Sequence, residues 1–91
     1  MSDSSHPILS LYHRSFCYFC SRVISVIKQL DLDIDGKNIW QDADAMNELE
    51  QATGRITVPV LRIESENGEV RWLPESADIV RYLATLRSYV L

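Results

Sequence analysis

The sequence has few cysteines, no excess of positive charge and no long apolar run. Only two of its 91 residues are cysteine, and nine Lys and Arg stand against thirteen Asp and Glu, for a formal net charge of -4. This balance argues against nucleic acid as the main partner, because phosphate binding needs clustered positive charge, and it disfavours anionic membrane surfaces. No stretch reaches the roughly 18 apolar residues that a membrane-spanning helix needs. We therefore expect neither nucleic acid nor a membrane as a partner.

The first six residues also lack the basic region and the apolar run of a signal peptide. We therefore expect a cytoplasmic protein, in a compartment where thiols are held reduced. Residues 1–7 are expected to form a flexible N-terminus and residues 8–91 a single domain. Because the two cysteines are only three positions apart, a disulfide between them would close almost no loop and add little stability. The pair is better explained by chemistry.

Hydrophobic patterning predicts four short strands. The apolar run at residues 8–12 is typical of a strand buried on both faces. Further strands are expected at residues 34–40, 59–63 and 70–73, and the turn signal Asn67-Gly68 predicts that the last two form a hairpin.

Three helices are expected between and after these strands. Residues 20–30 carry apolar side chains at steps of three and four, which predicts one buried side. A second helix is expected at residues 43–52, capped by Asp42 and ended by Gly54, and a third has Ser76 as its N-cap. The third helix has five apolar residues at helical spacing: Ile79, Val80, Leu83, Leu86 and Val90. The order β-α-β-α-β-β-α predicts an α/β protein with a mixed four-stranded sheet flanked by helices.

Cys17 and Cys20 fall where the first strand ends and the first helix begins. The free N–H groups and the positive dipole end of that helix favour a thiolate at Cys17, and Arg14 adds positive charge. Cys20, one turn further in, is expected on the buried side. Two sulfurs in unequal environments form a working dithiol, in which the exposed Cys17 attacks and Cys20 resolves the mixed disulfide.

Two other interpretations of the pair remain open. The cysteines could be half of a zinc site, although four N or S ligands are normally required and only His6 and His13 remain to supply them. They could also be inert core residues. His13 itself is expected at the surface, and Trp40, Trp72 and Tyr82 are expected in the core or lining a groove.

The spacing of two motifs resembles the glutaredoxin family. A strand, C-x-x-C at the start of a helix, then Thr57-Val58-Pro59, a hairpin and a final helix extend over residues 9–86. The resemblance implies a thioredoxin-like fold and a cis peptide bond between Val58 and Pro59. It also implies that the backbone of Val58 pairs with the cysteinyl part of glutathione.

The segment at residues 73–83 is similar instead to the N-terminal domain of glutathione transferases. That resemblance implies that Glu75 and Ser76 bind the γ-glutamyl group, and that Arg14 binds the glycine carboxylate, with Arg55 as a weaker candidate. Phe19 retains an aromatic residue beside the cysteines and joins the expected glutathione site. Capping of the last helix by Ser76, with Asp78 in its first turn, would explain the same segment without glutathione.

Tyr18 departs from the glutaredoxin pattern, which usually has proline directly after the first cysteine, and this leaves the thiol pKa open. The chain ends with the last helix, whereas a transferase would need a second, all-helical domain, so we expect no transferase activity from this chain alone.

We expect a glutathione-dependent thiol–disulfide oxidoreductase that reduces disulfides or glutathionylated proteins. Glutathione is its expected co-substrate; no metal is expected, and the chain is expected to be a monomer. Two alternatives are a thioredoxin-like electron donor to one protein partner and a redox-silent binding module.

Overall fold

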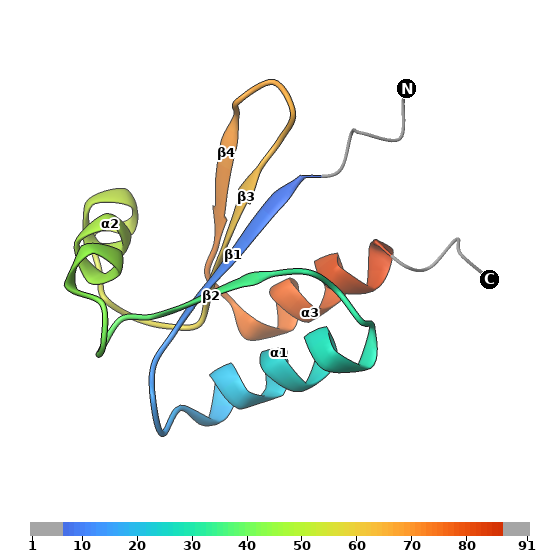
Figure 1. Cartoon of the computed structure of the whole chain (residues 1–91), viewed down its shortest axis with the longest axis horizontal. Coiled ribbons are helices and arrows are strands. Elements are labelled where there is room, and N and C mark those ends of the chain that lie inside the picture. The colour runs from blue at the N-terminus through green and yellow to red at the C-terminus, as the bar shows by residue number, and fades with distance from the viewer. Residues whose placement is uncertain (1–6, 87–91) are drawn as a thin grey trace.

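The computed structural model describes residues 7–86 as one sheet with three helices (Figure 1). The elements are β1 (Ile8–His13), α1 (Tyr18–Gln29), β2 (Asp35–Asn38), α2 (Ala43–Thr53), β3 (Val60–Glu64), β4 (Val70–Leu73) and α3 (Ser76–Thr85). This order confirms the predicted α/β, thioredoxin-like architecture. The expected flexible residues 1–6 and Val90 of the predicted last helix lie outside the described residues.

The sheet is mixed and has the strand order β2-β1-β3-β4. β1 pairs in parallel with β2 and antiparallel with β3, and β3 pairs antiparallel with β4. Leu11 of β1 lies opposite Gly36 on one side and Leu61 on the other. The hairpin between β3 and β4 turns through Gly68, whose φ of 91° is in the left-handed region that glycine adopts without steric cost.

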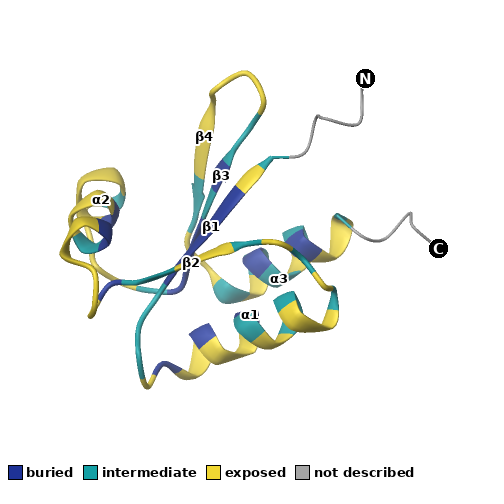
Figure 2. Ribbon diagram, viewed as in Figure 1, coloured by how far each residue is buried: buried dark blue, intermediate teal, exposed yellow. Residues whose placement is uncertain are grey.

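The two faces of the sheet carry separate hydrophobic clusters. Helices α1 and α3 lie on one face and α2 on the other (Figure 1). Successive side chains of a strand point to opposite faces, so Leu9 and Leu11 pack with α1 and α3, whereas Tyr12 packs with α2. The buried positions run along β1 and the inner sides of the helices (Figure 2). The longest described helix has 12 residues, and none is long and apolar enough to cross a membrane.

The predicted helix cap is confirmed for α2 and wrong for α3. α2 is capped as predicted, because a carboxylate oxygen of Asp42 accepts from the backbone N–H groups of Asp44 and Ala45 at 3.0 and 3.2 Å. Gly54 ends it with a φ of 77°. The prediction that Ser76 caps α3 was wrong: Ser76 is the first helical residue, because the extended backbone of Glu75 already accepts the first helical hydrogen bond from Ile79.

Candidate functional site

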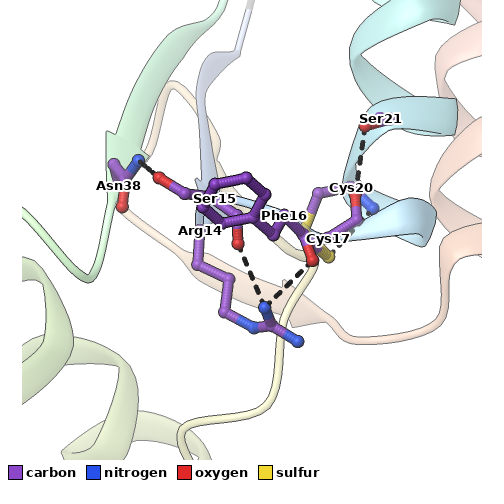
Figure 3. Close-up of a disulfide and its surroundings, with 7 residues drawn as sticks. All are labelled: Arg14, Ser15, Phe16, Cys17, Cys20, Ser21 and Asn38. Atoms are coloured by element: carbon purple, nitrogen blue, oxygen red, sulfur yellow. Dashed lines mark hydrogen bonds between the residues drawn. A yellow bond between two sulfur atoms is a disulfide. The ribbon is translucent and has the colours of Figure 1, made fainter.

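The two cysteines lie at the junction of β1 and α1 and are joined by a disulfide bond (Figure 3). Their Cα atoms are 5.2 Å apart. Cys17 is the N-cap of α1, and its Sγ accepts a hydrogen bond from the backbone N–H of Cys20 at 3.2 Å. The Ser21 hydroxyl donates to the carbonyl oxygen of Cys17 at 3.1 Å. The first turn of α1 therefore holds both the side chain and the backbone of Cys17.

The start of α1 favours negative charge on Cys17. The N–H groups of a first helical turn carry the positive end of the helix dipole, and the first turn of α1 has no acidic residue. When the disulfide is reduced, this environment stabilises a thiolate at the N-cap position. Cys20 is only 1% exposed and lies one helical turn further in. The two sulfurs are thus chemically unequal.

Cys17 is less accessible than the sequence predicted. Its relative exposure is 8%, so it is buried and not exposed. The physical reason is its role as N-cap, because the side chain turns back over the first helical turn to reach Cys20. Cys17 is nevertheless the more accessible of the two residues, in the order expected.

Arg14 holds the loop that precedes the cysteines. Its Nη1 donates to the carbonyl oxygens of Ser15 and Phe16, at 3.1 and 3.2 Å (Figure 3). Its guanidinium lies 5.1 Å from the ring centroid of Trp40, within the range of a cation–π contact. Arg14 thus brings positive charge to the loop beside Cys17 and is already engaged with protein groups.

Two expectations about neighbouring residues were wrong. Trp40 is not in the core, because the turn after β2 leaves it 56% exposed beside Arg14, and it does not line the hollow between the end of α2 and the end of β4. His13 is not at the open surface but half-buried at the end of β1. Burial lowers the pKa of its imidazole, and its Nε2 lies 3.2 Å from the position that a Cβ on Gly36 would take.

A hollow of about 430 Å³ brings two of the candidate glutathione ligands together. Its walls come from the end of α2, the loop before β3, and the end of β4: Ala52, Thr53, Arg55, Thr57, Trp72, Pro74 and Glu75. Arg55 and Glu75 are both exposed there and provide opposite charges. Arg14, the preferred carboxylate ligand in the sequence, is not among the described residues that line it. Thr53 and Thr57 were missed, and only the Thr57-Val58-Pro59 motif pointed to this loop.

The start of α3 lies beside this hollow and has no side-chain cap. Glu75 takes the N-cap position but makes no capping hydrogen bond. Asp78 accepts instead from Arg81, at 2.8 Å. Capping therefore does not explain this segment, because Glu75 holds the N-cap position and its side chain caps nothing. The backbone N–H groups at the start of α3 are open to an anionic group.

The remaining candidate residues lie on three different segments. The peptide bond between Val58 and Pro59 is cis, as the resemblance implied. Val58 is half-buried and Pro59 buried, just before β3. Phe19 is 53% exposed in the first turn of α1, and Ser76 is half-buried at the start of α3.

No cluster of three or more His, Cys, Asp or Glu side chains able to hold a metal is found within residues 7–86. His6, one of the two histidines of the zinc interpretation, lies outside that range. The interpretation of the cysteines as half of a zinc site therefore gains no support from the described part of the chain.

The fold and the cysteine pair together define a thioredoxin-fold protein with a dithiol at the start of its first helix. The family model described as "Glutathione S-transferase, N-terminal domain" matches residues 11–88, so the chain belongs to this family. No curated protein sequence matches the chain. The resemblance of residues 73–83 to these transferase domains is thereby extended to most of the chain.

Several solved structures share the fold. TDR1, a trimeric glutathione transferase from Leishmania, is 29% identical, with a TM-score of 0.69 over 86% of this chain and 17% of its own. A maleylacetoacetate isomerase from Anaeromyxobacter dehalogenans, with GSH bound in its active site, is 22% identical, with a TM-score of 0.70 over 93% and 40%. The thioredoxin-like protein BC3987 is 21% identical, with a TM-score of 0.65 over 88% and 94%. The chain thus spans less than half of the transferase and isomerase chains.

Proposed function

We propose that this protein is a glutathione-dependent thiol–disulfide oxidoreductase with Cys17 as the attacking sulfur. The observation that carries the proposal is the position of Cys17 at the N-cap of α1, bonded to Cys20 one turn further in. Inert core cysteines need no such position, whereas a nucleophilic thiolate gains from it. Membership in a family of glutathione transferase domains favours glutathione as the co-substrate.

The chemistry proceeds by thiol–disulfide exchange. The Cys17 thiolate attacks the glutathione sulfur of a mixed disulfide, the substrate leaves as a thiolate and takes up a proton, and a Cys17–glutathione disulfide forms. A second glutathione thiolate then attacks that glutathione sulfur, which releases oxidised glutathione and restores the Cys17 thiolate. Alternatively, Cys20 loses its proton and attacks Cys17, which releases glutathione and gives the internal disulfide, and two further glutathiones reduce it. In both routes glutathione supplies the two electrons.

Glutathione fits the hollow between the end of α2 and the end of β4 by charge. Arg55 suits the glycine carboxylate, and Glu75 suits the ammonium of the γ-glutamyl group. The uncapped start of α3, with Ser76 as its first residue, suits the γ-glutamyl carboxylate. Val58, next to the cis proline, remains the candidate to pair with the cysteinyl backbone. Arg14 and Phe19 are then the candidates near Cys17, where the sulfur of the central cysteinyl residue of glutathione reacts.

The proposal is tested by NADPH-coupled reduction of a small glutathione mixed disulfide, with glutathione and glutathione reductase present. Wild type, Cys17→Ser and Cys20→Ser are compared. We expect Cys17→Ser to lose at least about 100-fold in kcat, because no nucleophile remains, and Cys20→Ser to keep most of its activity by the one-cysteine route. Full turnover by Cys17→Ser would overturn the proposal.

The same assay tests the glutathione site. Arg55→Ala should raise the KM for glutathione by about tenfold, since a charge-assisted hydrogen bond contributes about 1.5 kcal/mol. Arg71→Ala is the matched control, because Arg71 is an equally exposed arginine on β4 outside this hollow. Equal KM values for the two variants would remove Arg55 from the site.

A second candidate is a transferase that conjugates glutathione to an electrophile. The family match favours it, because the model describes transferase domains. Conjugation to an aryl chloride by the Cys17→Ser protein, with no reduction of mixed disulfides by wild type, would favour this reaction over the oxidoreductase.

A further inference from the structure

Three exposed aromatic side chains are neighbours of the two cysteines in the chain, and a fourth, Trp40, pairs with one of them. Phe16 is 94% exposed, Tyr18 72%, Trp40 56% and Phe19 53%. They form two ring pairs, with centroids 6.5 Å apart for Phe16 and Trp40 and 5.4 Å apart for Tyr18 and Phe19. We call these four residues the aromatic surface. Such a concentration of exposed aromatic area is typical of protein-binding sites.

Phe16 lies in the loop between β1 and α1 and has an unusual backbone conformation. Its φ is 57°, a backbone conformation that is strained for a bulky residue. Arg14 stabilises it through hydrogen bonds to the carbonyl oxygens of Ser15 and Phe16 and through its contact with Trp40 (Figure 3). A nearly fully exposed phenylalanine in a strained conformation gains nothing for the fold, which points to a role outside the chain.

The segment that carries Phe16, Tyr18 and Phe19 is positively charged, although the chain as a whole is acidic. From position 7 to position 30 the sequence has no Asp or Glu but has Arg14, Arg22 and Lys28. Arg22 is exposed one helical turn after Tyr18, on the same side of α1. The positive end of the α1 dipole lies at Cys17. Asp42, near Trp40 in the chain, is engaged in capping α2. A partner that fits here is therefore negatively charged.

The shape of the surface favours a polypeptide over a small molecule. Small ligands bind in concave sites that cover most of their area. Side chains that are 53–94% exposed project outward instead, and they lose contact with water only when a second protein surface covers them.

We propose that the aromatic surface, together with Arg22, docks acidic segments of partner proteins and so makes cysteines in acidic sequences the preferred substrates of the Cys17–Cys20 pair. The substrate preference in this proposal depends on the proposed oxidoreductase function, whereas the binding of acidic segments depends only on the aromatic surface and Arg22. Phe16 and Tyr18 flank Cys17 in the chain, so a segment docked on them has its own cysteine beside the attacking sulfur.

The test uses two glutathionylated peptides of equal length with one central cysteine, flanked in one by Asp and Glu and in the other by Lys. We expect wild type to show a kcat/KM about tenfold higher for the acidic peptide at low salt, and a smaller ratio in high salt. Arg22→Glu should abolish the preference. Lys28→Glu makes the same charge change six residues further along α1, about 9 Å away, and should preserve the preference.

Phe16→Asn tests the aromatic part separately, because Asn tolerates a positive φ and removes only the ring. It should lower kcat/KM for the acidic peptide about fivefold and leave turnover of a small glutathione mixed disulfide unchanged. Equal kcat/KM for both peptides, or equal effects of Arg22→Glu and Lys28→Glu, would overturn the proposal.

Binding without chemistry separates this proposal from the oxidoreductase function. A fluorescent acidic peptide with Ser in place of its cysteine should bind wild type more tightly than Phe16→Asn or Arg22→Glu, as measured by anisotropy. If small mixed disulfides are not reduced but this difference is found, the oxidoreductase function fails and the docking surface stands. If they are reduced but the affinities are equal, the docking surface fails.

Discussion

At the scale of single residues, Tyr12 links the sheet to α2 just before the loop of the cysteines. Its buried phenol donates a hydrogen bond to Glu48 at 2.8 Å, and Lys37 lies 3.4 Å from the same carboxylate. Its ring packs 5.3 Å from that of Trp72, which lines the hollow. The bond from Tyr12 lowers the pKa of Glu48, and burial raises the pKa of Tyr12 well above its usual range. One side chain thus supports both parts of the site.

Replacing Tyr12 by Phe removes this hydrogen bond and leaves the ring. We expect Tyr12→Phe to lower the free energy of unfolding by about 0.5–1 kcal/mol at pH 7. The folded pKa of Glu48 is depressed, so its contribution is present above the unfolded pKa of about 4.3 and is lost as pH falls through the folded pKa. The difference between variant and wild type should therefore shrink in acid.

Urea unfolding at pH 7 and at about pH 3 measures both effects. Tyr18→Phe is the matched control, because Tyr18 is 72% exposed and its phenol has no hydrogen bond among the described residues. A loss for Tyr12→Phe no larger than that for Tyr18→Phe would contradict the role given to the bond.

At the scale of elements, the caps explain which helix ends the sequence predicts. Asp42 and Gly54 mark the ends of α2 unambiguously, because both act on backbone groups next to them in the chain. The start of α1 at the cysteine pair is confirmed, because Cys17 is the N-cap and Tyr18 the first helical residue. Ser76 was misplaced by one position because side-chain type alone does not fix where the backbone turns into α3.

The cap of α2 gives a prediction at this scale. Asp42→Ala should lower the free energy of unfolding by about 1 kcal/mol, since two backbone N–H groups lose their acceptor. Asp44→Ala removes the same charge in the first turn without removing the cap and should cost only about 0.3–0.5 kcal/mol. Thermal or urea unfolding of the two variants makes the comparison, and equal losses would mean that the charge matters and the cap does not.

At the scale of the whole molecule, the sequence predicted the order of elements and the mixed sheet because each strand and helix has its own local pattern. It did not predict the hollow, because Arg55 and Glu75 are twenty positions apart and meet only when α2 and β4 take their places. Phe16 and Trp40 meet in the same way, across the parallel pair of β1 and β2. The cysteine pair was found because its spacing is local. The burial of Cys17 was not predicted, because its exposure depends on how the whole fold covers the loop.

The proposed function depends most on Cys17 being the sulfur that reacts with glutathione. The most direct measurement is intact mass spectrometry of the reduced Cys17→Ser and Cys20→Ser proteins after brief exposure to oxidised glutathione, followed by peptide mapping. We predict that Cys20→Ser gains the mass of one glutathione at Cys17 much faster than Cys17→Ser gains it at Cys20, because the N-cap position stabilises the Cys17 thiolate and Cys20 is buried. Equal rates at the two sulfurs, or faster reaction at Cys20, would contradict the account.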